Sequence, residues 1–106
     1  YYFHILFNYI YRFMYLLGNK ATNKHVLITD AGSNYYIGGQ AWHFNNGGKE
    51  ISSGANAAMG LSLPLSIGAA VEEKKNQILS VTGDGSIELN IQELKTISHY
   101  KLNIKR

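Results

Sequence analysis

Apolar positions along the first part of the chain follow two different periods. Residues 2–17 place apolar and aromatic side chains on one wide face at helical spacing, which predicts a helix that ends at Gly18. After a polar connector, residues 25–29 form a short apolar run that predicts a buried strand. This run leads into residues 30–34, which contain an acid, a glycine and small polar side chains. The first strand therefore ends in a polar turn.

The middle of the chain is rich in small residues. Residues 35–43 contain two adjacent glycines, which weaken a helix by roughly 1 kcal/mol each, so only a short helix is expected there. A loop is expected over residues 44–49. Residues 51–60 are almost all small, which indicates a backbone that a ligand or a packed partner approaches closely. The following helix is expected to begin near Ser62 or Leu63, because Pro64 fits only its first turn.

The last third repeats the order of strand, turn and helix. Residues 77–82 predict a strand, residues 83–86 read Gly-Asp-Gly-Ser, and a helix is expected from Ile87 to Tyr100. Residues 102–106 resemble the start of another strand. The buried face of the helix is expected to hold Ile87, Ile91, Leu94 and Ile97.

Strands that alternate with helices predict an α/β protein with a mainly parallel sheet and helices on both faces. In such folds ligands bind at the carboxyl ends of the strands. Residues 30–34 and 83–86 should therefore meet at one edge, with residues 53–60 beside them. Two glycines around Asp84 allow a phosphate to approach the backbone while the carboxylate faces a cation such as Mg²⁺. The pattern predicts a site for a diphosphate and a divalent cation.

Composition narrows the classes of function. The chain has 106 residues and a net charge of +3, with its basic residues dispersed, so nucleic-acid binding is not expected. It has no cysteine, which excludes disulfides and thiolate metal sites and fits a reducing, cytoplasmic compartment. The apolar run at residues 2–17 contains polar side chains and is shorter than the ~20 residues of a membrane span. A signal peptide is not expected either.

Several spaced motifs resemble the diphosphate-binding domain of thiamine-diphosphate-dependent enzymes, with acetolactate synthase and related 2-oxo-acid decarboxylases as the most similar branch. The resemblance runs from about Val26 to the end of the chain. It rests on residues 30–33 (Asp-Ala-Gly-Ser), Gln40, residues 53–64 with 67–69, residues 83–86, Asn90 and residues 92–94. It implies a partial thiamine-diphosphate-binding fold, and both thiamine diphosphate and Mg²⁺ as cofactors.

The resemblance implies a role for each matching residue near the metal. Asp84 matches the family's Mg²⁺-binding aspartate. Gly83, Gly85 and Ser86 match the residues around it that contact the diphosphate through backbone and hydroxyl groups.

The other matching residues differ partly from the family pattern. Met59 matches the bulky apolar residue between the two rings of the cofactor. Ala57 stands where the family has a glycine whose carbonyl group accepts a hydrogen bond from the aminopyrimidine. A Gly-Gln-His run that approaches the terminal phosphate corresponds here to Gly32, Ser33 and Asn34.

The resemblance also implies what lies outside residues 1–106. The family's second metal ligand belongs to an Asn-Asn pair that would follow Arg106, and its activating glutamate lies on a separate domain of a partner subunit. The chain is therefore expected to be a single partial domain, cut before the closing motif, with no catalytic residue and no turnover of its own. The complete protein is expected to be a homo-oligomeric lyase or transferase. It would decarboxylate a small-molecule 2-oxo acid, with or without carboligation.

The sequence leaves two other interpretations of the function open. One is a nucleotide- or dinucleotide-binding α/β module, although residues 83–85 do not continue into the dinucleotide fingerprint and residues 47–50 lack parts of a phosphate loop. The other is a folding or assembly piece without a site. Asp30 is expected to form a turn, and the four histidines are expected to be structural because none has a partner at metal spacing.

Overall fold

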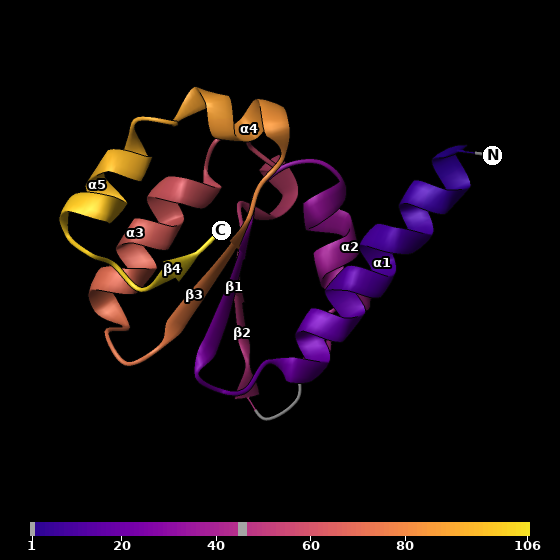
Figure 1. Cartoon of the computed structure of the whole chain (residues 1–106), viewed down its shortest axis with the longest axis horizontal. Coiled ribbons are helices and arrows are strands. Elements are labelled where there is room, and N and C mark those ends of the chain that lie inside the picture. Colours follow the sequence, from indigo (N-terminus) through magenta and orange to yellow (C-terminus); the bar gives the residue numbers. More distant parts are fainter. Residues whose placement is uncertain (1, 45–46) are drawn as a thin grey trace.

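The chain folds around a four-stranded sheet in which all strands are parallel. The computed structural model describes residues 2–44 and 47–106, with side chains from residue 9 onward. The strand order is β2-β1-β3-β4 (Figure 1). The strands are β1 (His25–Thr29), β2 (Lys49–Ile51), β3 (Gln77–Val81) and β4 (Ile104–Lys105).

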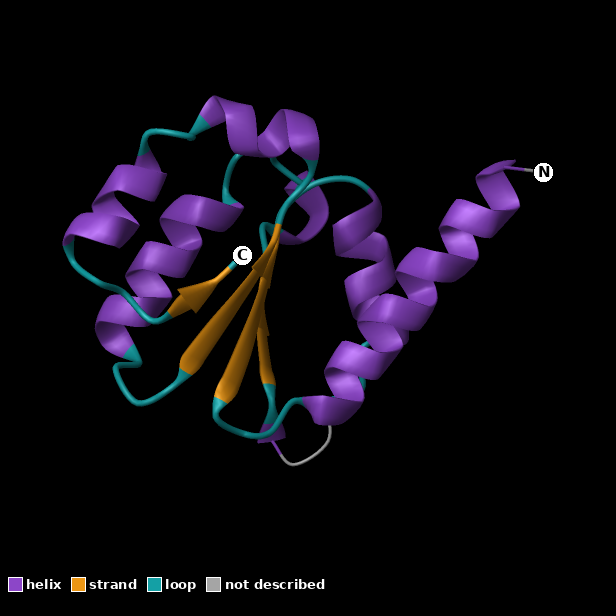
Figure 2. Cartoon of the chain, viewed as in Figure 1, coloured by secondary structure: helices purple, strands orange, loops and turns teal. Residues whose placement is uncertain are grey.

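Helices cover both faces of the sheet (Figure 2). One face carries α1 (Tyr2–Lys20) and α2 (Ser33–Ala41), and a 3-10 turn, η2 (Gly54–Asn56), precedes the helices of the other face. That face carries α3 (Ser62–Glu72), α4 (Asp84–Leu89) and α5 (Glu93–His99). The prediction of an α/β fold with a parallel sheet between two helical layers is confirmed. None of the helices in the described part of the chain has the length and apolar character needed to cross a bilayer.

Each face of the sheet has its own hydrophobic core. Successive residues of a strand point to opposite faces, so the apolar run of β1 supplies both cores. Val26 and Ile28 pack with α3 and α5 residues in one core, and Leu27 packs with Met14 and Trp42 in the other. The uninterrupted apolar sequence of β1 follows from burial on both sides.

Gly18 does not end the first helix, contrary to the prediction. The helix continues to Lys20, and Gly18 is buried against the segment that follows α2. A Cβ atom at Gly18 would lie 3.0 Å from the backbone nitrogen of His43. The glycine therefore allows two backbones to approach closely.

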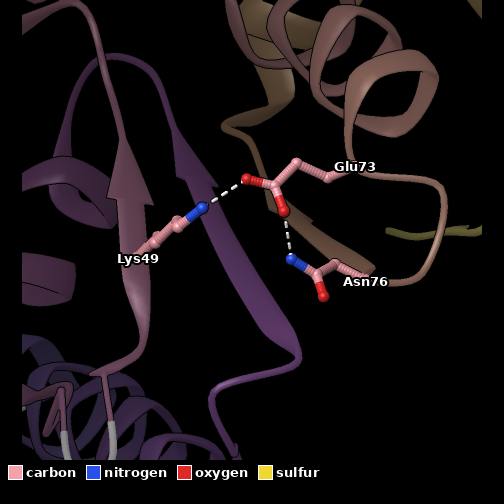
Figure 3. Close-up of polar contacts among 3 residues, drawn as sticks. All are labelled: Lys49, Glu73 and Asn76. Carbon is pink, nitrogen blue, oxygen red and sulfur yellow. Dashed lines mark hydrogen bonds and ion pairs between the residues drawn. The ribbon is translucent and has the colours of Figure 1, made fainter.

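The second strand was not predicted, and only its first residue, Lys49, falls in the loop expected over residues 44–49. Residues 49–51 pair with β1 in parallel register, whereas Asn45 and Asn46 of the predicted loop lie outside the described residues. Figure 3 shows that Lys49 forms an ion pair with Glu73, whose other carboxylate oxygen accepts a hydrogen bond from Asn76. Lys49 is thus paired with an acidic side chain at the start of β2 and does not hold an anion as the lysine of a phosphate loop would.

The final helix begins earlier than predicted and is interrupted. Helix α4 begins at Asp84, ends at Leu89, and is followed by a turn before α5. In that turn the side-chain amide of Asn90 donates a hydrogen bond of 2.6 Å to the carbonyl oxygen of Gly60. The break rotates Ile91 away from the core, and its side chain is 55% exposed instead of buried.

Candidate functional site

A cavity of about 540 Å³ lies where the carboxyl ends of β1 and β3 reach the same edge of the sheet. Small-molecule sites commonly have volumes of roughly 300–1,000 Å³. Four segments line the cavity: residues 31–34, residues 81–86, Met59, and Ile10, Phe13 and Met14 of α1. The cavity brings together all the predicted site residues except Ala57, namely Gly32, Ser33, Asn34, Met59, Gly83, Asp84, Gly85 and Ser86.

The loop after β1 is held by its own side chains. Asp30 is fully buried, and its Oδ1 accepts a hydrogen bond of 2.8 Å from the backbone N–H of Ala31. The side-chain oxygen of Asn34 accepts from the backbone N–H of Asp30 at 3.1 Å, and its nitrogen donates to the carbonyl of Ala31 at 2.7 Å. Gly32 takes a φ of 84°, in the region that favours glycine. The turn is therefore rigid before any ligand arrives.

A side-chain hydrogen bond joins this loop to the one after β3. The hydroxyl of Thr82 donates to Oδ2 of Asp30 over 2.9 Å. The two residues follow paired neighbours, because Thr29 lies opposite Val81 in the register of β1 and β3. Asp30 thus does more than form a turn, since its carboxylate connects both loops that line the cavity.

The Gly-Asp-Gly loop presents an exposed carboxylate at the cavity. Gly83 precedes α4 in an extended conformation, and Oδ1 of Asp84 accepts a hydrogen bond of 2.9 Å from the N–H of Gly85. A carboxylate has several acceptor positions, so this bond leaves Asp84 able to bind a cation. Ser86 is only 3% exposed yet lines the cavity. The first N–H groups of a helix have no acceptor within it, which adds donors for an anion.

Met59 reaches across the cavity toward the same loop. Its side chain is 55% exposed, and its terminal methyl carbon lies 3.2 Å from the position that a Cβ atom on Gly85 would take. The neighbouring Gly60 has a φ of 80° and is held by the hydrogen bond from Asn90. Met59 is therefore anchored at its backbone and adaptable at its tip.

Ala57 adopts a conformation in which glycine is normally found. Its φ is 41° and its ψ is 47°, in the left-handed region, and its N–H donates to the carbonyl of Gly54 at 3.0 Å. Left-handed geometry costs an L-residue roughly 1–2 kcal/mol. The residue does not line the cavity, but its backbone shape is the one that a glycine would adopt freely.

The described residues do not complete a metal site by themselves. No group of three or more His, Asp or Glu side chains placed to hold a metal occurs in the part of the chain that the structure describes. Mg²⁺ is usually held by one or two carboxylates together with phosphate oxygens and water. Asp84, exposed beside a cavity with room for a phosphate, suits that partial role.

The part of the cavity wall that comes from α1 was not predicted from the sequence. Ile10, Phe13 and Met14 line the cavity, although the helix was predicted only to pack. Phe13 is 56% exposed, whereas Met14 is buried against the sheet. Helical spacing alone cannot separate a core residue from a cavity residue on the same face. The contribution of Thr82 was missed for a similar reason, because a threonine at a strand end has no distinctive pattern.

Comparison with known proteins identifies the family of the chain. The family described as "Thiamine pyrophosphate enzyme, C-terminal TPP binding domain" matches residues 30–106. The chain belongs to this family. Thiamine pyrophosphate is another name for thiamine diphosphate, so the resemblance read from residues 30–34, 53–64 and 83–86 is confirmed. The matched range includes every predicted site residue and excludes α1.

Similar curated proteins include acetolactate synthases, several of them large subunits. The chain is 36% identical over 80 residues to acetolactate synthase isozyme 1 large subunit of Escherichia coli (strain K12), covering 76% of this chain and 14% of that protein. It is 36% identical over 87 residues to the Cyanidium caldarium large subunit, covering 82% of this chain and 15% of the relative. For acetolactate synthase 2, chloroplastic, of Brassica napus, the identity is 34% over 90 residues, covering 85% and 14%. The chain thus spans about one seventh of the length of these relatives.

Proposed function

We propose that residues 32–34 and 83–86 bind the diphosphate of thiamine diphosphate, and that Asp84 binds the accompanying Mg²⁺. The observation that carries this proposal is the convergence of both loops on one cavity with the Asp84 carboxylate exposed at its wall. Glycines at 83 and 85 leave the backbone accessible there, and Ser33 and Ser86 add hydroxyl groups. The donor set suits a phosphate and a hard cation.

The apolar part of the cavity lining suits an organic ring. Ile10, Phe13, Met14, Met59 and Val81 supply apolar surface there. Met59 fits a supporting role beneath the cofactor because its flexible side chain can adjust to the ring that it contacts. The left-handed backbone at Ala57 is consistent with the family's glycine at that position, and we propose that its carbonyl group accepts a hydrogen bond from the aminopyrimidine.

We propose that the complete protein is an acetolactate synthase-like lyase or transferase, homo-oligomeric and cytoplasmic, that acts on a small 2-oxo acid by decarboxylation with or without carboligation. Bound thiamine diphosphate supplies the carbanion chemistry for that class of reaction. Residues 1–106 position the cofactor, and we expect no turnover from them alone. Among the described residues that line the cavity, Asp84 is the only acidic or basic one.

Calorimetric titration tests the proposal directly. The protein that carries this chain should bind thiamine diphosphate in the presence of Mg²⁺, and chelation of the metal should weaken that binding. A parallel titration with nicotinamide nucleotides separates the proposal from a nucleotide-binding module. Binding of a nucleotide without binding of thiamine diphosphate would refute the proposed function.

A further inference from the structure

The carboxylate of Asp30 is buried without a basic partner. It is fully inaccessible to solvent, and its two oxygens accept one hydrogen bond each, from the N–H of Ala31 and the hydroxyl of Thr82. Among the described residues the structure shows an ion pair between Lys49 and Glu73, and none at Asp30. A buried carboxylate depends strongly on its hydrogen bonds, because a lost donor leaves part of its charge unsolvated.

The hydrogen bond with Thr82 fixes more than one side chain. Thr82 directly precedes Gly83, where the backbone leaves β3. Its hydroxyl donates to Asp30 over 2.9 Å, and the carbonyl oxygen of Gly83 is a second, longer acceptor at 3.4 Å. The next residues hold their shape through short-range bonds, from the N–H of Gly85 to Asp84 and from the N–H of Ile87 to the carbonyl of Gly83. These local bonds shape the loop but do not set its position relative to the first loop.

The other half of the connection lies in the first loop. Asn34 holds the backbone of residues 30 and 31 through both ends of its side-chain amide, at 3.1 and 2.7 Å. A rigid turn thus carries the Asp30 carboxylate, and that carboxylate holds Thr82. This chain of hydrogen bonds connects the two cavity-lining loops, above the β1–β3 pairing.

We propose that Asp30 is a positioning residue, which acts through the hydroxyl of Thr82 to hold the loop at 83–86 at the separation from residues 31–34 that a diphosphate requires. The proposal rests on the proposed function for the identity of the ligand. The hydrogen bond itself and its effect on the loop do not depend on that ligand.

Substitution of Thr82 separates positioning from general stability. Thr82→Val keeps the shape of the side chain and removes its hydroxyl, whereas Thr82→Ser keeps the hydroxyl as a matched control. In the complete protein, Thr82→Val should weaken Mg²⁺-dependent binding of thiamine diphosphate about tenfold, as expected when a partner behind a ligand-binding group is lost. Thr82→Ser should restore most of the affinity. Binding of thiamine without phosphates should differ little between the two variants.

Amide hydrogen exchange without ligand supplies the second measurement. In Thr82→Val the N–H groups of Gly85 and Ile87 should exchange faster than in the wild type, while those of β1 should be unchanged. Unchanged exchange, or wild-type affinity in the folded valine variant, would overturn the proposal. So would failure of that variant to fold while Thr82→Ser folds, since the hydroxyl would then be required for the fold. If the wild type does not bind thiamine diphosphate, the proposed function fails, and the exchange result alone decides on positioning.

Discussion

The terminal methyl carbon of Met59 lies 3.2 Å from the position that a Cβ atom on Gly85 would take. Both residues line the cavity, one from the segment before α3 and the other from the first turn of α4. The absence of a side chain at Gly85 therefore makes room for the tip of Met59. A substitution at Gly85 should move that tip within the cavity without disturbing the backbone.

Gly85→Ala should consequently affect ligand binding more than stability. The contact is with the end of a flexible side chain, so we expect the free energy of unfolding to change by less than about 1 kcal/mol. Affinity for thiamine diphosphate should fall, because Met59 is displaced. The control is Gly68→Ala in α3, because that glycine does not line the cavity and an added Cβ atom there would meet nothing within 4 Å. Equal affinities for the two variants, measured by calorimetry, would contradict this account.

Asp84 should be required for binding of the metal but not for the conformation of the loop at residues 83–86. Asp84→Asn retains an oxygen that can accept from the N–H of Gly85, and it removes the negative charge. We expect Mg²⁺-dependent binding of thiamine diphosphate to weaken by about a hundredfold, equivalent to roughly 3 kcal/mol. Glu88→Gln is the matched control, because Glu88 is an exposed acid of the same helix that does not line the cavity. Unchanged affinity in Asp84→Asn would remove this residue from the metal site.

Ala57→Gly should stabilise the protein. The wild-type alanine has a φ of 41°, and glycine reaches this region without steric strain. The relief of strain exceeds the greater entropy of the unfolded glycine, so we expect a gain of about 1 kcal/mol. Urea denaturation measures the difference. Ala55→Gly, at an exposed position within η2, should instead be neutral or destabilising. A loss of stability in Ala57→Gly would show that the left-handed geometry is not strained.

The sequence predicted those features of the fold and site that depend on local patterns. The apolar run at residues 25–29 coincides with β1, and the position of Pro64 placed the start of α3 correctly at Ser62. Parallel strands bring their carboxyl ends to one edge, so residues 30–34 and 83–86 could be placed together before the structure was known. Strand positions and their parallel arrangement therefore predicted which two loops line the cavity.

What could not be predicted depends on contacts between residues distant in the chain. Strand β2 is too short for a periodic signal and is defined by its pairing with β1. At the interruption between α4 and α5, Asn90 donates a hydrogen bond to Gly60, thirty residues earlier. The link from Thr82 to Asp30 spans 52 positions. No local sequence pattern indicates such distant hydrogen-bond partners.

Gly60→Ala should be strongly destabilising. The residue has a φ of 80°, and an added Cβ atom would lie 3.0 Å from both the Cβ of Leu89 and the side-chain nitrogen of Asn90. Backbone strain and overpacking together should cost about 3 kcal/mol. Gly39→Ala provides the contrast, because that glycine lies within α2 with open space around it. Alanine there should increase the free energy of unfolding by at most about 1 kcal/mol. Equal changes in the thermal unfolding temperature of the two variants would contradict the proposed crowding at Gly60.

Glu50 should make the stability of the protein depend on pH. Burial raises the pKa of its carboxyl group above the ordinary value of 4.5, and the hydrogen bond from Thr29 only partly opposes this effect. The protonated form is therefore favoured in the folded state. Its stabilising contribution is fully present below pH 4.5 and is lost as the pH rises through the folded-state pKa.

Glu50→Gln should accordingly be no more stable than the wild type in acid and more stable at neutral pH, because glutamine mimics the protonated acid. The difference in free energy of unfolding between variant and wild type, measured by urea denaturation across that range, isolates Glu50 from the other titrating groups. Thr29→Val should enlarge the pH dependence, since it removes the hydrogen bond of 3.2 Å that favours the ionised form. A difference between Glu50→Gln and the wild type that stays constant with pH would show that burial does not raise this pKa.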